Sequence, residues 1–173
     1  MPYEDNYLEL GLDVAFANTG VVLVKGKQVI YGHTIVTEKD KNAKYVMDSH
    51  RARCLKLAYE LYEIIDRYKP DKAYVELPTG ASQSAVSALT MGLAIGVVTT
   101  VLWANAIPTK FVNPTHVKKA ADGSHKASKE DVEIGVRKAF EWDSWPKNKG
   151  VREHMCDALG AILAGRKLNM ARV

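Results

Sequence analysis

The chain has 173 residues, a length typical of one globular domain, and we expect a single domain over residues 1–173. Hydrophobic residues make up 47% and charged residues 25%, a balance that excludes a largely disordered chain. The net charge of +4 permits a polyanionic partner but does not establish one.

The first part of the chain predicts three antiparallel strands and a helix. The strands are apolar, β-rich segments: Tyr7 to Ala15, Gly20 to Lys25 and Gln28 to Thr37. Gly26 lies in the short break between the last two and can adopt the positive φ of a tight hairpin. From Ala43 to Tyr68 the apolar residues recur at helical spacing, and Pro70 ends that helix.

The rest of the chain alternates strands and helices. The predicted order is a strand over Asp71–Leu77, a long uncharged helix over Ala81–Ala106, and a strand over Ile107–Asn113. Three helices then begin at Pro114, at Ser128 with a capping box to Asp131, and at about Arg152, the last running to Leu168. We therefore expect an α/β fold with a mixed five-stranded sheet, three antiparallel strands then two parallel ones, flanked by helices.

The long uncharged helix needs a test against a membrane span. Its Gly92 and Gly96 form the GxxxG pattern of closely packed transmembrane helices. Many Ser and Thr residues, together with Gln83 and Asn105, would be costly in hydrocarbon, so a buried helix is the better interpretation. We therefore expect no membrane partner.

The localisation is expected to be cytoplasmic. The segment Met1–Asn6 is polar and acidic and lacks the features of a signal peptide. Cys54 and Cys156 are too few and too far apart to staple a domain of this size, which fits reduced thiols.

Two carboxylates stand in apolar strands, where a charge is costly unless it is paired or metal-bound. Asp13 lies in the segment Leu10 to Ala15, and Glu76 ends the strand that precedes Pro78. Strand ends of this kind are common ligand sites. Either acid alone could be a strand-end carboxylate paired with a lysine, but two together weaken that interpretation.

A third group of polar residues begins the last helix. His154 and Asp157 are three residues apart and therefore share one face, while Leu159 and Ile162 can point toward the sheet. Acidic ligands that converge on one spot can hold two cations for phosphodiester hydrolysis. Without further context, a surface imidazole and a helix N-terminal charge would be the simpler interpretation.

Four segments, in the same order along nearly the whole chain, resemble RuvC-type Holliday-junction resolvases. They are Gly11–Val22, Ala73–Leu77, Ser87–Gly96 and His154–Ala161. The resemblance implies a ribonuclease H-like fold and a catalytic, metal-binding set of Asp13, Glu76, His154 and Asp157. It also implies that Asp13 bridges two Mg²⁺ ions, for which Mn²⁺ could substitute, and that no small-molecule cofactor is used. Whether His154 ligates metal or transfers a proton stays open.

The same resemblance implies how DNA is held. The segment Pro114–Lys119 is similar to a basic element of the family, and Lys129 falls near a second one. Phosphate contacts are expected from Lys118, Lys119, Lys126 and Lys129. Similar resolvases form homodimers through the helix that corresponds to Ala81–Ala106, and the two-fold symmetry of a four-way junction suits a dimer with two active sites.

The sequence departs from the family at two places. Val14 and Ala15 follow Asp13 where the family usually has Pro-Gly, and Pro78-Thr79 occupies a loop that often carries a base-stacking aromatic residue. These departures put the turn after Asp13 and the sequence preference in question.

The expected function is resolution of four-way DNA junctions by paired, symmetric, metal-dependent incisions. Two alternatives remain: a ribonuclease H-like nuclease for other branched DNA or RNA–DNA hybrids, and an inert junction-binding protein. A sugar-kinase-like ATPase shares the opening Gly-x-Asp strand, but 173 residues are too few for its two-lobed cleft.

Overall fold

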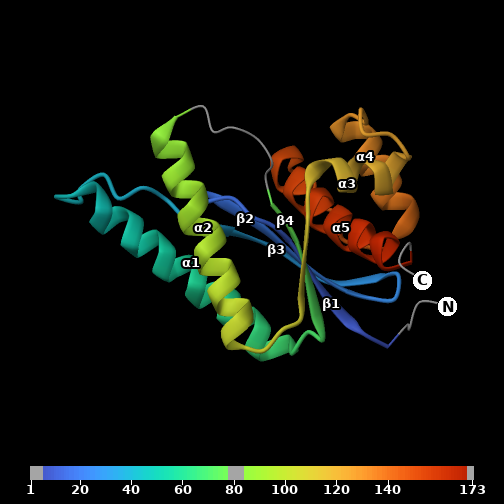
Figure 1. The fold of residues 1–173 in the computed structure, drawn as a ribbon, viewed down its shortest axis with the longest axis horizontal. Helices are drawn as coiled ribbons and strands as arrows, with labels where there is room; N and C mark the ends of the chain where they lie inside the picture. Colours follow the sequence, from blue (N-terminus) through green and yellow to red (C-terminus); the bar gives the residue numbers. More distant parts are fainter. Residues whose placement is uncertain (1–5, 78–83, 171–173) are drawn as a thin grey trace.

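The computed structural model describes residues 6–77 and 84–170. Its strands are β1 (Leu8–Asp13), β2 (Asn18–Lys25), β3 (Gln28–Val36), β4 (Lys72–Glu76) and β5 (Thr109–Val112). Its helices are α1 (Val46–Tyr68), α2 (Ala85–Ala104), α3 (Pro114–Asp122), α4 (Lys129–Ala139) and α5 (Lys149–Met170). Figure 1 shows α1 and α2 on one face of the sheet and α3, α4 and α5 on the other.

The five strands form one mixed sheet in the order β3-β2-β1-β4-β5. β1, β2 and β3 are antiparallel neighbours, while β4 pairs parallel to β1 and β5 parallel to β4. The expected mixed sheet of three antiparallel and two parallel strands is therefore confirmed. β1 lies in the centre of the sheet. Because β4 runs parallel to β1, the carboxyl ends of these two strands lie side by side at the same end of the sheet.

Alternation along the strands divides the apolar side chains into two cores. On β1, Leu10 and Leu12 pack against α1 and α2. On β2, Val21 and Leu23 join that core, while Val22 and Val24 belong to the core under α3, α4 and α5. Because the period of a strand is two, the odd-numbered positions of β1 face α5.

The helix α5 lies close against those odd-numbered positions of β1. A Cβ atom added to Gly11 would collide with the backbone carbonyl oxygen of Ala158 and lie 2.9 Å from Ile162. Arg166, two turns further along α5, donates a hydrogen bond of 2.7 Å to the buried carboxylate of Glu9. Glycine at position 11 therefore sets the distance between helix and strand.

Local sequence signals placed most boundaries correctly. Gly26 has φ of 60° in the β2–β3 turn, and the Ser128 hydroxyl accepts a hydrogen bond from the Asp131 N–H. α5 begins at Lys149 rather than near Arg152, because the Asn148 side chain accepts a hydrogen bond from the Val151 N–H and extends the helix backwards. The expected turn at 78–80 and helix start at Ala81 lie outside the described residues.

The expectation of a buried α2 is wrong. Only Ala94, Val98 and Leu102 of this helix are buried, and the apolar window long enough to span a membrane is 17% buried. The helix packs on α1 with one face and leaves several large apolar side chains exposed, including Trp103, which is 81% exposed. Its uniform apolarity is therefore not explained by the core of a single chain.

Replacement of Gly11 by alanine should destabilise the fold, because the new Cβ must push α5 away from β1. We expect a loss of about 1–3 kcal/mol or more in the free energy of unfolding, measured by urea denaturation. Gly150→Ala is the matched control, since the nearest atom to its added Cβ is 3.5 Å away. Equal stability of the two variants would contradict the close packing.

Candidate active site

Asp13 and Glu76 are neighbours at the carboxyl edge of the sheet. They are paired positions of the parallel strands β1 and β4, and both end their strands. In parallel pairing the two side chains leave the same face of the sheet, here the face covered by α5. The register of β1 and β4 thus brings together two carboxylates that are 63 residues apart in the sequence.

The first turns of α5 bring His154 to Asp13. The Nδ1 atom of His154 lies 2.8 Å from Oδ2 of Asp13. The approach depends on Gly20, which pairs with Asp13 across β1 and β2: a Cβ at Gly20 would lie 2.5 Å from the His154 carbonyl oxygen. The hydrogen bond to Asp13 raises the pKa of His154, which favours the imidazolium form.

Three carboxylates share this space. Burial, followed by the charges of Asp157 and Asp13, raises the pKa of Glu76 to about 8. Burial and the charge of Asp13 also raise the pKa of Asp157. Negative charges that perturb one another across a partly buried space are costly without a cation. Asp13, Glu76, His154 and Asp157, the four residues singled out from the sequence, therefore lie in one electrostatic cluster.

Among the described residues, Lys129 is the lysine that forms an ion pair with this cluster. Its Nζ lies 3.6 Å from Asp157 and 3.3 Å from Glu153. Burial lowers the pKa of Lys129, but Asp157 and Glu153 together raise it above its ordinary value. In the described ranges, no ion pair joins Lys118, Lys119 or Lys126 to the cluster, and Glu153 is a participant that sequence reasoning missed.

The side chains present fit a divalent cation in their chemistry. One carboxylate oxygen of Glu76, Oε2, is buried without a hydrogen-bond partner. Oxygen ligands with excess negative charge suit Mg²⁺ or Mn²⁺. Within residues 6–77 and 84–170, however, no three His, Cys, Asp and Glu side chains are already arranged to hold a metal ion. Asp13 is instead bonded to His154, and Asp157 is paired with Lys129.

The turn after Asp13, which the sequence left in question, is firmly held. The Arg53 side chain donates to the Phe16 carbonyl oxygen (3.2 Å) and to the Thr37 hydroxyl (3.0 Å). The Arg53 guanidinium also lies 4.0 Å from the centre of the Phe16 ring. Val14 and Ala15 therefore do not leave the turn loose. The sequence offered no signal for Arg53, because its role depends on contacts between distant segments.

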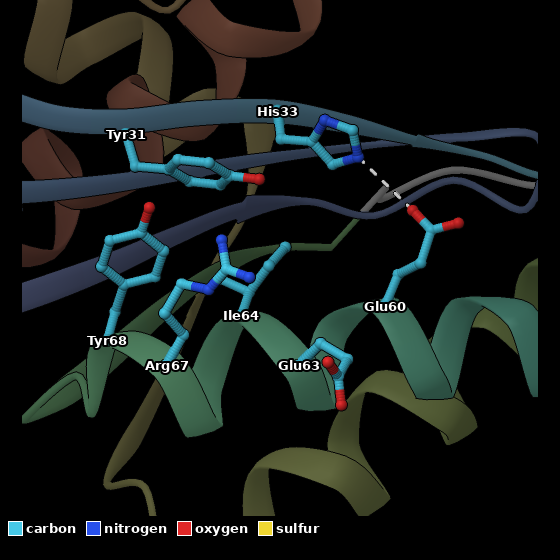
Figure 2. Close-up of a pocket in the computed structure, with 7 residues that line it drawn as sticks. All are labelled: Tyr31, His33, Glu60, Glu63, Ile64, Arg67 and Tyr68. Atoms are coloured by element: carbon cyan, nitrogen blue, oxygen red, sulfur yellow. Dashed lines mark hydrogen bonds and ion pairs between the residues drawn. The ribbon is translucent and has the colours of Figure 1, made fainter.

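A cavity of about 170 Å³ lies elsewhere, between β3 and α1. Figure 2 shows that Tyr31 and His33 line it from the strand, opposite residues of α1. None of the four clustered residues lines this cavity. It is therefore separate from the carboxylate cluster.

Comparison with known proteins identifies the family. The family model described as crossover junction endodeoxyribonuclease RuvC matches residues 10–164. The chain belongs to the RuvC family. A RuvC from Pseudothermotoga lettingae is 33% identical over 142 residues, which cover 79% of this chain and 82% of the relative. A RuvC from Thermus thermophilus is 28% identical and covers 88% of this chain and 89% of its own length.

Solved structures of RuvC proteins and related resolvases share the fold. T. thermophilus RuvC in complex with a Holliday junction substrate has a TM-score of 0.80 at 23% identity, covering 96% of this chain and 97% of that one. The yeast mitochondrial Holliday junction resolvase Ydc2 has a TM-score of 0.66 at 14% identity, covering 99% and 84%. The expected ribonuclease H-like fold is confirmed.

Glu76→Gln should stabilise this RuvC-family chain when EDTA removes divalent cations. Between pH 4.5, the usual value for glutamate, and pH 8, folded Glu76 keeps a proton that the unfolded chain has lost, so stability falls as pH rises. Glutamine removes that penalty. We expect a gain on the order of 2 kcal/mol at pH 8.5, or about 4–8 °C in Tm, and a smaller gain at pH 5.

The matched control is Glu38→Gln, because Glu38 is exposed. Differential scanning calorimetry at both pH values measures the effect. A gain that is the same at pH 5 and pH 8.5, or that Glu38→Gln also produces, would contradict a strained carboxylate at position 76.

Proposed function

We propose that the chain is a structure-selective DNA endonuclease that resolves four-way junctions by paired, symmetric, metal-dependent incisions. The observation that carries the proposal is the cluster of Asp13, Glu76 and Asp157, three carboxylates that share a partly buried space and include an unpartnered oxygen of Glu76. Family membership supplies the reaction class, since the curated relatives are named crossover junction endodeoxyribonucleases.

In this proposal the four clustered residues hold two Mg²⁺ ions, or Mn²⁺ in their place. When bound, these ions supply an activated water and stabilise charge on the leaving oxygen. Asp13 is central, since it couples to both Glu76 and Asp157. Glu76 offers its unpartnered Oε2.

His154 is placed to hold a proton. Its Nδ1 is engaged with Asp13, which orients the ring and stabilises the imidazolium. A group held in this way can give or take a proton near the cleaved bond, or give up the Asp13 contact to bind a cation. The proposal keeps both roles for His154, and no small-molecule cofactor is needed for either.

Lysines beside the cluster are proposed to hold the DNA backbone. Lys129 begins α4 and is 61% exposed while it touches Asp157, so its ammonium can meet a phosphate at the mouth of the site. Lys118 and Lys119 lie on α3, and Lys126 lies in the loop that joins α3 to α4. α3 and α4 lie on the same face of the sheet as α5 (Figure 1), which makes these lysines candidates for contacts with DNA at the cluster.

Incubation of the purified protein with a labelled immobile four-way junction, a linear duplex and an RNA–DNA hybrid tests the proposal. We expect symmetric nicks in the junction alone, and only with Mg²⁺. Asp13→Asn should lower the cleavage rate at least about a hundredfold while junction binding in a gel-shift assay is kept. Asp66→Asn, at an exposed position of α1, is the matched control.

Other outcomes distinguish the alternatives. Binding without cutting would favour an inert junction-binding protein, and preferential cutting of the hybrid or another branched DNA would keep the metal site but change the substrate. Cutting by Asp13→Asn at the normal rate would remove Asp13 from the site.

The free face of α2 is proposed to form the interface of a homodimer. Gly92 and Gly96 have open space where a Cβ would stand, and they line a groove between α1 and α2. Leu89 and Trp103 extend the same exposed stripe at helical spacing. A second α2 can pack against such a surface, and a two-fold dimer places two sites on the two-fold symmetry of a junction. With this face covered, we propose a soluble, cytoplasmic protein.

Gly96→Arg should convert the dimer to a monomer. The position is open in a single chain, so the new side chain costs the protomer little but blocks a close helix contact. Light scattering at micromolar concentration should give twice 19.1 kDa for the unchanged protein and 19.1 kDa for the variant. Ala52→Arg, at an exposed position of α1, should remain dimeric. A monomeric mass for the unchanged protein would refute the interface.

A further inference from the structure

The cavity between β3 and α1 brings three hydrogen-bond donors together. Arg67, Tyr31 and Tyr68 line it, the arginine exposed and the two tyrosines half-buried. In Figure 2 the Arg67 guanidinium and the Tyr31 hydroxyl point into the same space. Burial and the neighbouring Tyr68 raise the pKa of Tyr31, so its phenol is a donor at neutral pH. Grouped donors of this kind suit an anion.

The anion that fits is a single carboxylate rather than a polyanion. Glu60 lines the cavity at its other end, paired with His33 at 3.4 Å and with Lys56 at 3.6 Å, and Glu63 also lines it. A polyanion would bring several charges against these glutamates, whereas one carboxylate can meet Arg67 alone. The rings of Tyr31 and Tyr68, whose centres are 5.0 Å apart, add an apolar wall. An acidic side chain on an otherwise neutral segment matches both features.

The strand beside the cavity is open to pairing. β3 is the outermost strand of the sheet, and its sequence QVIYGHTIV contains no Pro, Lys, Asp or Glu that would protect an edge. At its beginning the chain's own Glu141 already pairs with it, accepting a hydrogen bond of 2.9 Å from the Val29 N–H. From Ile30 to Val36, no described segment continues that pairing.

We infer that this edge and the cavity together bind an extended segment of a partner protein. The segment pairs with β3 between Ile30 and Val36 and places an acidic side chain against Arg67 and the two tyrosine hydroxyls. Backbone pairing provides the affinity, and the pocket selects the acidic residue. The surface is separate from the carboxylate cluster, so the inference goes beyond the nuclease activity and does not rest on it.

Two blocked nine-residue peptides of alternating Thr and Val test this, one with a central Asp and one with Asn in its place. Hydrogen–deuterium exchange of the full chain should slow in residues 31–36 with the Asp peptide. Calorimetric titration should give binding at least about tenfold weaker for the Asn peptide, and for Arg67→Gln with the Asp peptide.

Lys69→Gln is the matched control. Lys69 lies two residues after Arg67 and carries the same charge, but its side chain does not line the cavity. This variant should bind the Asp peptide as the unchanged protein does, and Arg67→Gln should keep the circular dichroism spectrum and the Tm of the unchanged protein, which shows that it folds. Equal binding of the two peptides, unchanged binding by Arg67→Gln, or no protection in residues 31–36 would each overturn the inference. Sodium acetate tests whether the cavity binds a free anion instead. If acetate displaces the Asp peptide in the titration, while the peptide does not slow exchange in residues 31–36, the partner segment is likewise refuted.

Discussion

The close contact of α5 with the central strand β1 is the constraint on which the other features depend. Three odd-numbered positions of β1 meet α5 in turn: Asp13 meets His154, Gly11 meets the Ala158 backbone, and Glu9 meets Arg166. A helix can follow a strand at this distance only where the strand lacks a side chain between its polar ends. The same contact therefore completes the core under α3, α4 and α5 and positions Asp13 and His154, two of the four clustered residues.

The two acidic residues of β1, Glu9 and Asp13, have different roles because their neighbours carry different charges. Glu9 is 3% exposed, yet Arg166 bonds to it and Lys72 lies 3.1 Å away, so its charge is matched by cations. Asp13 shares its end of the strand with Glu76 and Asp157, whose pKa values are raised first by burial and then by the neighbouring carboxylates. Glu9, paired with cations, stabilises the fold. At the other end of β1, three carboxylates lie together in a partly buried space, which is the property that a cation site needs.

The sequence predicted the sheet, the two strand-end acids and the shared face of His154 and Asp157, because these follow from periodicity and local spacing. It could not predict that Lys129 alone of the four lysines reaches the cluster, since that depends on how α4 packs beside α5. Nor could it reveal Arg53, which acts across three segments. The exposure of α2 was mispredicted for a related reason: an apolar helix has the same composition whether its own chain or another one covers it.

The free apolar face of α2 also links the stability of the protein to its abundance. If a second copy covers Gly92, Gly96 and Trp103, dissociation returns a large apolar surface to water and lowers the free energy of unfolding. By mass action, the temperature of unfolding then rises with protein concentration. A cell that holds few copies would keep a larger share of them as single chains, which are both less stable and more prone to aggregate.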